Sequence, residues 1–133
     1  MRYVLDACIP IASMRPSEPL YVVSLGRIQR LQSGADTIVV PSLFQVEVTA
    51  GLTRGGLPPA VVEAFVDELL AHAEVVTVGP IRARQIAGVA MRARLRAGDA
   101  AYVWLAAREA VPLVTDDQEI ISRAGTVCTV QAP

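Results

Sequence analysis

Carboxylates are the side chains of this sequence that could do chemistry, because the other common catalytic groups are scarce or absent. The chain of 133 residues has 13 acidic residues, no lysine and a single histidine, His72. The missing lysine excludes a Walker A phosphate loop and Schiff-base chemistry, and one histidine leaves at most one base for a serine or cysteine nucleophile. Cys8, His72 and Cys128 lie too far apart in sequence to have the spacing of a zinc site. Catalysis would therefore depend on carboxylates.

Four acidic residues occupy positions that are unusual for solvated charges. Asp6 and Asp117 each follow an apolar run typical of a buried strand, and Asp99 begins a helix that is apolar on nearly every side. Glu47 lies on the apolar face of another predicted helix, with no basic residue three or four positions away. The alternatives are that the three aspartates are helix N-caps, or for Asp99 a partner of the helix dipole, and that Glu47 pairs with a distant arginine. Seven other acids are expected on solvated helix faces: Glu18, Asp36, Glu63, Asp67, Glu68, Glu74 and Glu109.

The four unusual positions favour a shared metal site. In a parallel sheet the carboxyl ends of the strands meet at one edge, which is where ligands bind. Four carboxylates gathered there would repel one another unless cations or protons neutralised them. Oxygen ligands suit hard cations such as Mg²⁺ and Mn²⁺, which can activate water and hold a phosphoryl group for in-line displacement. Because lysine is absent and histidine is scarce, a metal-activated water is the expected nucleophile.

Alternating strands and helices must position these acids. Hydrophobic runs and turn residues predict the order β-α-α-β-α-α-β-α-α-β-α-β, which favours one α/β domain, residues 1–133, with a mainly parallel central sheet. The predicted strands span residues 2–6, 37–40, 75–78, 112–115 and 126–130. The predicted helices begin near residue 7 and then span residues 18–33, 41–54, 58–71, 79–96, 98–110 and 116–124. Ser42 and Gln45 have the spacing of a capping box at the start of the helix over residues 41–54.

Composition narrows the class of protein further. The chain is 53% hydrophobic, yet its longest uninterrupted apolar stretch, residues 100–107, is far shorter than the ~18 to 20 residues of a membrane span. Asp6 interrupts any signal-peptide core, and two distant cysteines are typical of a reducing compartment, so we expect a cytoplasmic protein without a membrane segment. The net charge of −1 argues against nucleic-acid binding through overall basic charge, so such binding would need a local patch or metal ions.

Four segments, in order along the chain, resemble the PIN-domain family of metal-dependent nucleases. They are Val-Leu-Asp-Ala-Cys-Ile at residues 4–9, Val-Glu-Val-Thr-Ala-Gly-Leu at 46–52, Asp-Ala-Ala-Tyr-Val-Trp-Leu-Ala at 99–106 and Leu-Val-Thr-Asp-Asp at 113–117. Their spacing spans nearly the whole chain, and the length is similar to that of the single-domain VapC-type toxins of bacterial and archaeal toxin–antitoxin pairs. The resemblance implies a PIN-like three-layer α/β/α sandwich.

The resemblance also implies an activity and the residues that carry it. It implies an endoribonuclease that cuts RNA phosphodiester bonds with Mg²⁺ or Mn²⁺ held by an acidic quartet. By position, the quartet is Asp6, Glu47, Asp99 and Asp117. Thr115 matches the threonine of the family's Thr-x-Asp motif and would contact a ligand or a water, while Asp116 leaves a second candidate for the fourth acid. Cys8 departs from the small polar residue that many members carry, which puts one supporting hydrogen bond in doubt.

Partners follow from the same resemblance. VapC-type toxins form homodimers and are silenced by a cognate antitoxin that covers the site, so the expected partners are RNA, an antitoxin and a second copy of the chain. For RNA contact, Arg82, Arg92 and Arg96 share an arc of roughly 80° on an ideal helix at about 100° per residue. Solvated arginines are the alternative. Tyr102 and Trp104 could stack on bases, but their apolar helix favours core packing.

Other families with acids at strand ends fit less well. A receiver domain and a haloacid-dehalogenase-type phosphatase both need a lysine, and a dinucleotide-binding unit needs Gly-x-Gly-x-x-Gly after its first strand. The sequence has neither feature. Two alternatives stay open, a stand-alone RNA-processing nuclease of the same family and a non-catalytic PIN-like binding module. All four acidic positions are filled, which argues against the binding module.

Overall fold

The computed structural model describes all 133 residues and contains one five-stranded sheet flanked by helices. The strands are β1 (Arg2–Leu5), β2 (Thr37–Pro41), β3 (Ala73–Val76), β4 (Leu113–Val114) and β5 (Val130–Gln131). The helices are α1 (Cys8–Ser13), α2 (Tyr21–Gln32), α3 (Leu43–Arg54), α4 (Pro59–Ala71), α5 (Pro80–Ala93), α6 (Ala97–Glu109) and α7 (Gln118–Arg123). This element order is the one that the sequence predicts.

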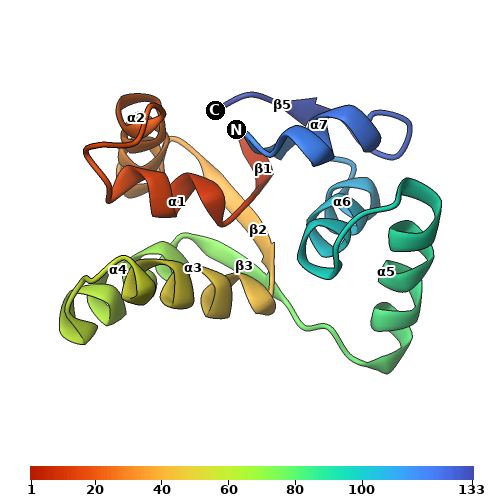
Figure 1. Ribbon diagram of the computed structural model, residues 1–133, viewed down its shortest axis with the longest axis horizontal. Coiled ribbons are helices and arrows are strands. Elements are labelled where there is room, and N and C mark those ends of the chain that lie inside the picture. The colour runs from red at the N-terminus through yellow and green to blue at the C-terminus, as the bar shows by residue number, and fades with distance from the viewer.

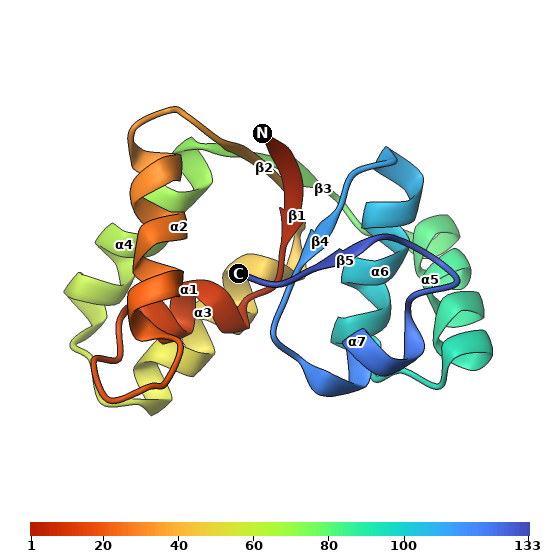
Figure 2. The same cartoon turned by 90° about the horizontal axis from the view of Figure 1, so that it is seen from above.

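Every neighbouring pair of strands in the sheet is parallel, and the strand order is β3-β2-β1-β4-β5. In this register Val4 of β1 pairs with Val39 of β2 on one side and with Leu113 of β4 on the other. Helices α1 to α4 lie on one side of the sheet, and α5 to α7 lie on the other (Figures 1 and 2). The predicted three-layer α/β/α sandwich is confirmed, and its sheet is parallel throughout.

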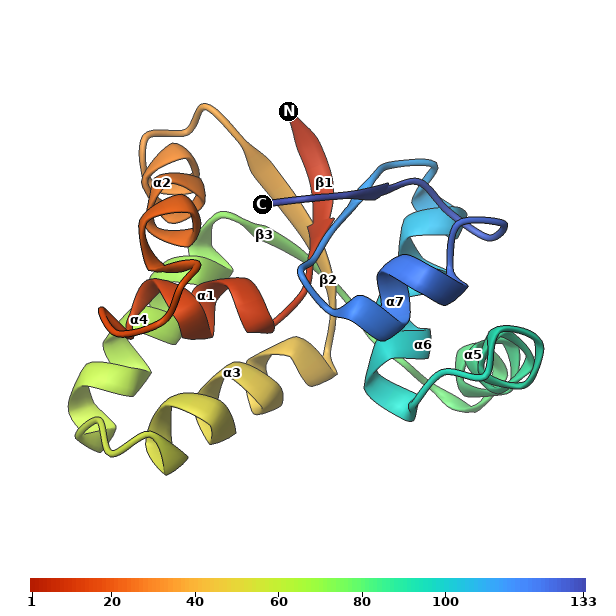
Figure 3. The same cartoon turned by 45° about the horizontal axis from the view of Figure 1, so that its top comes forward.

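The direction in which the sheet grows reverses between β1 and β4. From β1 the chain moves outward to β2 and β3 through α1 to α4, and it then returns through α5 and α6 to β4 on the other side of β1 (Figure 3). In open α/β sheets, ligands bind beyond the carboxyl ends of the strands at such a switch point. Asp6 directly follows β1, and Asp117 follows β4 after two intervening residues. The topology therefore brings these two acids to the expected ligand-binding edge.

Buried apolar side chains fill both sides of the sheet, and α6 is the helix that holds most of one side. Its residues 100–106 are all buried, and the helix packs against β1, β2 and β4. Because α6 is apolar on several faces, its position is fixed by packing rather than by caps. Its first turn contains Asp99, so this acid is carried on a rigid support. No helix of the chain is both long and apolar enough to cross a membrane.

Two predicted strands are displaced along the chain. β3 is Ala73–Val76 rather than residues 75–78, because its pairing with β2 begins directly after α4. β5 is only Val130–Gln131 rather than residues 126–130, because it pairs solely with the two-residue β4. The ends of both strands are set by the length and register of the neighbouring strand, which a hydrophobic run does not reveal.

The predicted capping box at the start of α3 is wrong. Ser42 is the N-cap residue, but its side chain makes no capping hydrogen bond. Its hydroxyl instead accepts a hydrogen bond from the Val78 amide at 3.3 Å. The hydroxyl therefore ties the beginning of α3 to the chain that follows β3, a contact between segments far apart in sequence.

One acid expected on a solvated helix face is buried. Asp36 is 1% exposed, and its carboxylate accepts hydrogen bonds from Arg30 Nε at 2.8 Å and Arg30 Nη2 at 2.9 Å. The amine of Met1 donates to the same carboxylate at 3.1 Å. These bonds explain why a charged residue is found inside, since a buried carboxylate needs hydrogen bonds and a counter-charge.

Candidate active site

Four carboxylates from four different elements meet beyond the carboxyl ends of β1 and β4. Asp6 follows β1, Asp117 precedes α7, Asp99 lies in the first turn of α6, and Glu47 lies in α3. Burial, followed by the negative charges of Asp117, Asp6 and Glu47, raises the pKa of Asp99 to about 6. The structure therefore brings together the four acids that the sequence singles out, closely enough for each of the other three to act on Asp99.

Asp6 is almost enclosed, with 6% of its surface exposed. The Thr115 hydroxyl donates to Asp6 Oδ2 at 2.6 Å, and the Cys8 amide donates to Oδ1 at 3.2 Å. Burial is the main reason that the pKa of Asp6 is raised, and the charge of Asp117 adds to the rise, while these hydrogen bonds oppose it. Cys8 thus supports Asp6 through its backbone amide, a bond that does not depend on the polarity of the side chain.

Thr115 links two of the acids. Its buried hydroxyl donates to Asp6 and accepts a hydrogen bond from the Asp117 amide at 3.0 Å. Asp117 is also the N-cap residue of α7, where its Oδ1 accepts hydrogen bonds from the amides of Glu119 at 2.8 Å and Ile120 at 3.1 Å. The helix-cap alternative is therefore correct for Asp117. The cap engages one carboxylate oxygen and fixes the orientation of the group.

Glu47 is held by an aromatic hydroxyl rather than by an arginine. Tyr102 donates to Glu47 Oε2 at 2.6 Å, and no ion pair of the structure includes Glu47, so the ion-pair alternative is wrong. Burial raises the pKa of Glu47, and the charge of Asp6 raises it further. Tyr102 and Trp104 are both buried in the core, as expected. The role of Tyr102 was missed, although its spacing of three residues from Asp99 predicts that both lie on one helix face.

The donor set and one unpartnered atom fit a divalent cation. All four acids offer oxygen, and Asp99 Oδ2 is buried without a hydrogen-bond partner. Asp99 makes no capping bond to α6 and is not its N-cap residue, but its place in the first turn fits the alternative of a helix-dipole partner. Gly98 leaves the space that Glu47 Oε1 occupies, because a Cβ atom on residue 98 would collide with that oxygen. No three His, Cys, Asp or Glu side chains are placed so that they could ligate one metal ion together. The four acids are therefore neighbours whose oxygens do not yet converge on a single point.

Two cavities flank the acids. A mainly apolar cavity of about 630 Å³ lies between α3, α5 and α6, and Glu47 and Gly98 are part of its lining. A second cavity of about 330 Å³ lies beside α1, and Asp116 and Asp117 are part of its lining. Of these two neighbours, Asp117 is the one whose charge acts on Asp99. The influence on Asp99 therefore comes from Asp117, the acid that the spacing to Thr115 also favours, and not from Asp116.

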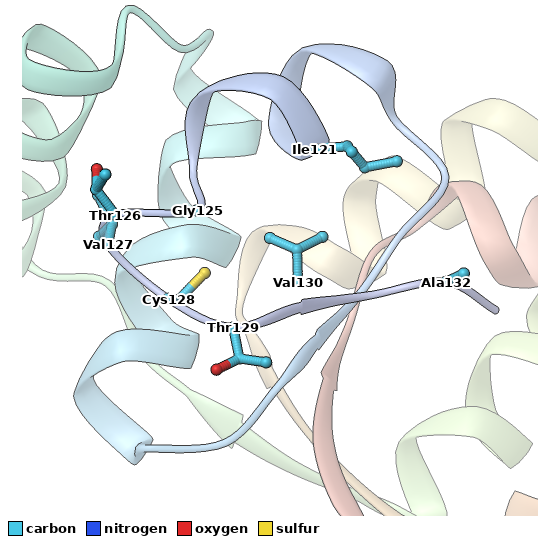
Figure 4. Close-up of a pocket in the computed structure, with 8 residues that line it drawn as sticks. All are labelled: Ile121, Gly125, Thr126, Val127, Cys128, Thr129, Val130 and Ala132. Atoms are coloured by element: carbon cyan, nitrogen blue, oxygen red, sulfur yellow. The ribbon is translucent and has the colours of Figure 1, made fainter.

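A third cavity, of about 690 Å³, lies away from the acids, between α7 and the C-terminal segment (Figure 4). Cys128 and Val130 point from that segment toward α7, and Thr129 points the other way. Its lining contains no charged residue and consists of Ile121, Gly125, Thr126, Val127, Cys128, Thr129, Val130 and Ala132. Although this cavity is the largest of the three, it offers no group suited to the chemistry of the acids.

The three arginines expected to share one arc do not lie on one helix. α5 ends at Ala93 rather than at residue 96, because Arg94 adopts a left-handed backbone conformation with a φ of 53°. Arg92 is exposed in the last turn of α5, and Arg82 lies in its first turn with Nη1 donating to a backbone carbonyl of the preceding loop at 2.7 Å. Arg96 lies beyond the end of this helix, so the predicted arc is wrong.

Arg96 is nevertheless the one of these three arginines whose charge changes the pKa of an acid in the site. It precedes α6, its side chain is 75% exposed, and its Nε lies 3.5 Å from Glu119 Oε2. Its positive charge partly opposes the rise in the pKa of Asp99, whose main cause is burial. A group with this exposure and this reach is suited to meet an anionic ligand at the acidic site.

A family model described as PIN domain matches residues 3–126. This chain belongs to the PIN domain family. All four acids, together with Thr115, lie within the matched part of the PIN domain. The resemblance of the four segments is therefore confirmed over nearly the whole chain.

Solved structures with the same fold cover almost all of this PIN domain. VapBC2 from Rickettsia felis, bound to a DNA fragment from its promoter, gives a TM-score of 0.70 at 14% identity and covers 99% of this chain and 98% of that chain. PAE2754 from Pyrobaculum aerophilum gives 0.68 at 18% identity, covering 98% and 89%. FitAB bound to an IR36 DNA fragment gives 0.69 at 16% identity, covering 100% and 95%. No curated protein matches the sequence.

Proposed function

We propose that this PIN domain is a metal-dependent endoribonuclease and the toxin of a toxin–antitoxin pair. The enzymatic part rests on the buried, unpartnered Asp99 Oδ2, which has three further carboxylates close enough to act on it. A buried acid without a hydrogen bond or a cation weakens a fold, and such perturbed groups concentrate at functional sites. The toxin role is supported by the likeness in fold to VapBC2 and FitAB.

The residues that would hold the cation are the acidic quartet. They are Asp6, Glu47, Asp99 and Asp117. An all-oxygen set of this kind suits Mg²⁺ or Mn²⁺ better than zinc or copper. When bound, the cation lowers the pKa of water and offsets the charge that develops on a phosphoryl group during in-line displacement.

The chain's own residues orient these carboxylates before any ligand arrives. Thr115 and the Cys8 amide fix Asp6, and the first turn of α7 fixes Asp117. Tyr102 fixes Glu47 through one of its two oxygens. Rigid support of this kind matters because a ligand group that is misplaced or mobile loses much of its effect on rate.

The substrate and the partners belong to the same proposal. Exposed Arg96 would contact an RNA phosphate beside the acids, and Arg92 and Arg82 would extend this contact along α5. The protein would act in the cytoplasm as a homodimer, and a cognate antitoxin would silence it by covering the acids. A stand-alone RNA-processing role would use the same site and differ only in its partner.

The direct test is cleavage of a labelled RNA pool by the purified protein in Mn²⁺, in Mg²⁺ and in EDTA. We expect cleavage with either cation and none in EDTA. Asp99→Asn should lower the rate of cleavage at least ~100-fold, because it removes one of the carboxylates that would hold the cation beside the reacting phosphate. Asp67→Asn is the matched control, since Asp67 is an exposed acid on α4 remote from the site, and it should cut like the wild type.

Each outcome decides a different part of the proposal. Full activity in Asp99→Asn would show that the acidic assignment is wrong. Folded protein, free of any antitoxin, that cuts no RNA with either cation would favour the binding-only alternative. The toxin role is tested separately by induced expression in a bacterial host, where the wild type should arrest growth and Asp99→Asn should not.

A further inference from the structure

The cavity of about 330 Å³ beside α1 contains two groups that the proposed chemistry does not use. It lies between α1, the loop that follows α1 and the loop after β4. Its lining is Cys8, Ile11, Ala12, Arg15, Glu18, Leu20, Asp116 and Asp117. Arg15 is the single cation of this lining, and Glu18 is the single acid outside the pair that follows β4. The cavity therefore has an apolar part, one neighbouring pair of opposite charges, and the two acids that follow β4.

Arg15 is held in place beside Glu18. Its Nη2 donates to the Gly51 carbonyl at 2.8 Å, and its Nη1 lies 3.7 Å from Glu18 Oε1. A Cβ atom on Gly55 would approach Arg15 Nη2 to 2.9 Å, so the guanidinium packs closely against the end of α3. Glu18 is 42% exposed, little more than the 36% of Arg15, and it makes no other side-chain contact with a charged group. The pair thus presents a donor anchored on a backbone carbonyl beside an acceptor that no other charged group engages.

We propose that this cavity binds one base of the RNA substrate, next to the phosphate that is cut, and that Arg15 and Glu18 select guanine there. The proposal rests on the proposed nuclease function. Asp117 is shared by the acidic site and by the lining of this cavity. A nucleotide whose base enters the cavity would therefore have its phosphate beside the acids.

The choice of guanine follows from the pattern of donors and acceptors. Guanine offers two acceptors, O6 and N7, to a guanidinium, and its N1–H and N2–H₂ groups can donate together to a carboxylate. A neighbouring cation and carboxylate can therefore satisfy guanine along one continuous edge. Adenine, cytosine and uracil each lack the pair of adjacent donors that a carboxylate accepts. The apolar part of the cavity, Ile11, Ala12 and Leu20, would contact the flat face of the base.

The test is to map the bases that flank each cut in a randomised RNA pool, using wild type, Glu18→Gln and Glu63→Gln. Wild type should favour guanine at one fixed position relative to the cut. Glu18→Gln should lower the ratio of cuts beside guanine to cuts beside adenine about tenfold or more, because the amide cannot accept from both donors. Glu63→Gln removes an exposed acid of α4 and should keep the preference.

A binding measurement separates failure of this subsite from failure of the nuclease. Fluorescence anisotropy with Asp99→Asn compares short RNAs that carry either one guanine or one adenine, and it needs no cleavage. If wild type cuts without base preference, or Glu18→Gln keeps the preference, the subsite is wrong and the nuclease stands. If wild type cuts nothing, the nuclease is wrong, and the binding data alone then support the subsite through a guanine preference or overturn it through equal binding. Tight binding of free guanosine monophosphate without any preference in cleavage would also overturn the proposal.

Discussion

Two regions of this molecule bury aspartate oxygens and treat the negative charge in opposite ways. Asp36 lies against Arg30 and the Met1 amine, and the hydrogen bonds from Arg30 are the main reason that its pKa falls to about 2. Asp99 has no cation in hydrogen-bond contact and one oxygen without any partner. Burial and three neighbouring acids raise its pKa to about 6.

This contrast distinguishes an acid that stabilises the fold from one that the fold tolerates. A carboxylate that is paired in the folded state and free in the unfolded state contributes stability. A carboxylate buried among other carboxylates reduces stability, and a ligand that binds only the folded state can restore it. The chain supplies hydrogen-bonded counter-charges at Asp36, whereas at Asp99 it supplies only the weaker influence of exposed Arg96, which forms no ion pair with it. This is the arrangement expected when most of the second counter-charge comes from a bound cation.

The largest effect on stability should come from removing the charge of Asp36, which is paired with Arg30 and the Met1 amine. Asp36→Asn should lower the free energy of unfolding by about 2 kcal/mol, because it removes charge-assisted hydrogen bonds from a buried position. Asp67→Asn, at an exposed acid of α4, should change it by less than about 0.5 kcal/mol. Urea unfolding followed by circular dichroism measures both. Equal stability of the two variants would mean that the Asp36 contacts contribute little.

The pairing of Asp36 with Arg30 should make the free energy of unfolding depend on pH in acid. Because the pKa of Asp36 is lower in the folded state than in the unfolded state, folded protein binds fewer protons between about pH 4 and pH 2. Its contribution is therefore present above about pH 4 and is lost as the pH falls toward 2. The unfolding free energy of wild type should decline more steeply over this window than that of Asp36→Asn. Parallel declines would contradict the assignment.

Most of the fold could be predicted from the sequence because strong local signals agree with its topology. β-branched runs, Pro and Gly at helix ends, and the apolar helix over residues 97–109 give the order of all twelve elements. The errors occur where a distant partner decides the outcome. The Ser42 hydroxyl bonds to Val78 instead of capping α3, and Asp36 is drawn inside by Arg30. Neither partner is identifiable from local spacing.

The acids of the candidate site were also accessible from the sequence, because each breaks an apolar pattern. Asp6 and Asp117 follow β1 and β4, and the parallel sheet brings those ends together. The supporting contacts were less accessible. The hydrogen bond from Tyr102 to Glu47 joins residues of α6 and α3, and it depends on how closely those helices pack at Gly98. Such a distance emerges only from the assembled fold.

A divalent cation should stabilise the fold through the acids around Asp99 and not through Asp36. Millimolar Mn²⁺ should raise the melting temperature of wild type by a few degrees, because binding to the folded state alone shifts the equilibrium by about 1 to 2 kcal/mol at modest excess over the dissociation constant. Asp36→Asn should gain as much, since its acidic site is intact, and Asp99→Asn should gain little. Differential scanning calorimetry with and without EDTA measures this, and an unchanged wild type would argue against a cation site.

The smallest effect on stability should come from removing the charge of Asp99 in the absence of a cation. Without divalent cations, Asp99→Asn should change the free energy of unfolding by less than about 1 kcal/mol, and toward greater stability, because it ends the repulsion from Asp117, Asp6 and Glu47. The isosteric amide keeps the volume at the start of α6, so packing should not oppose this gain. The sign is therefore opposite to that of Asp36→Asn, although both variants put an amide in place of an aspartate that has a buried oxygen. A loss as large as that of Asp36→Asn, measured by urea unfolding in EDTA, would mean that the charge of Asp99 serves the fold.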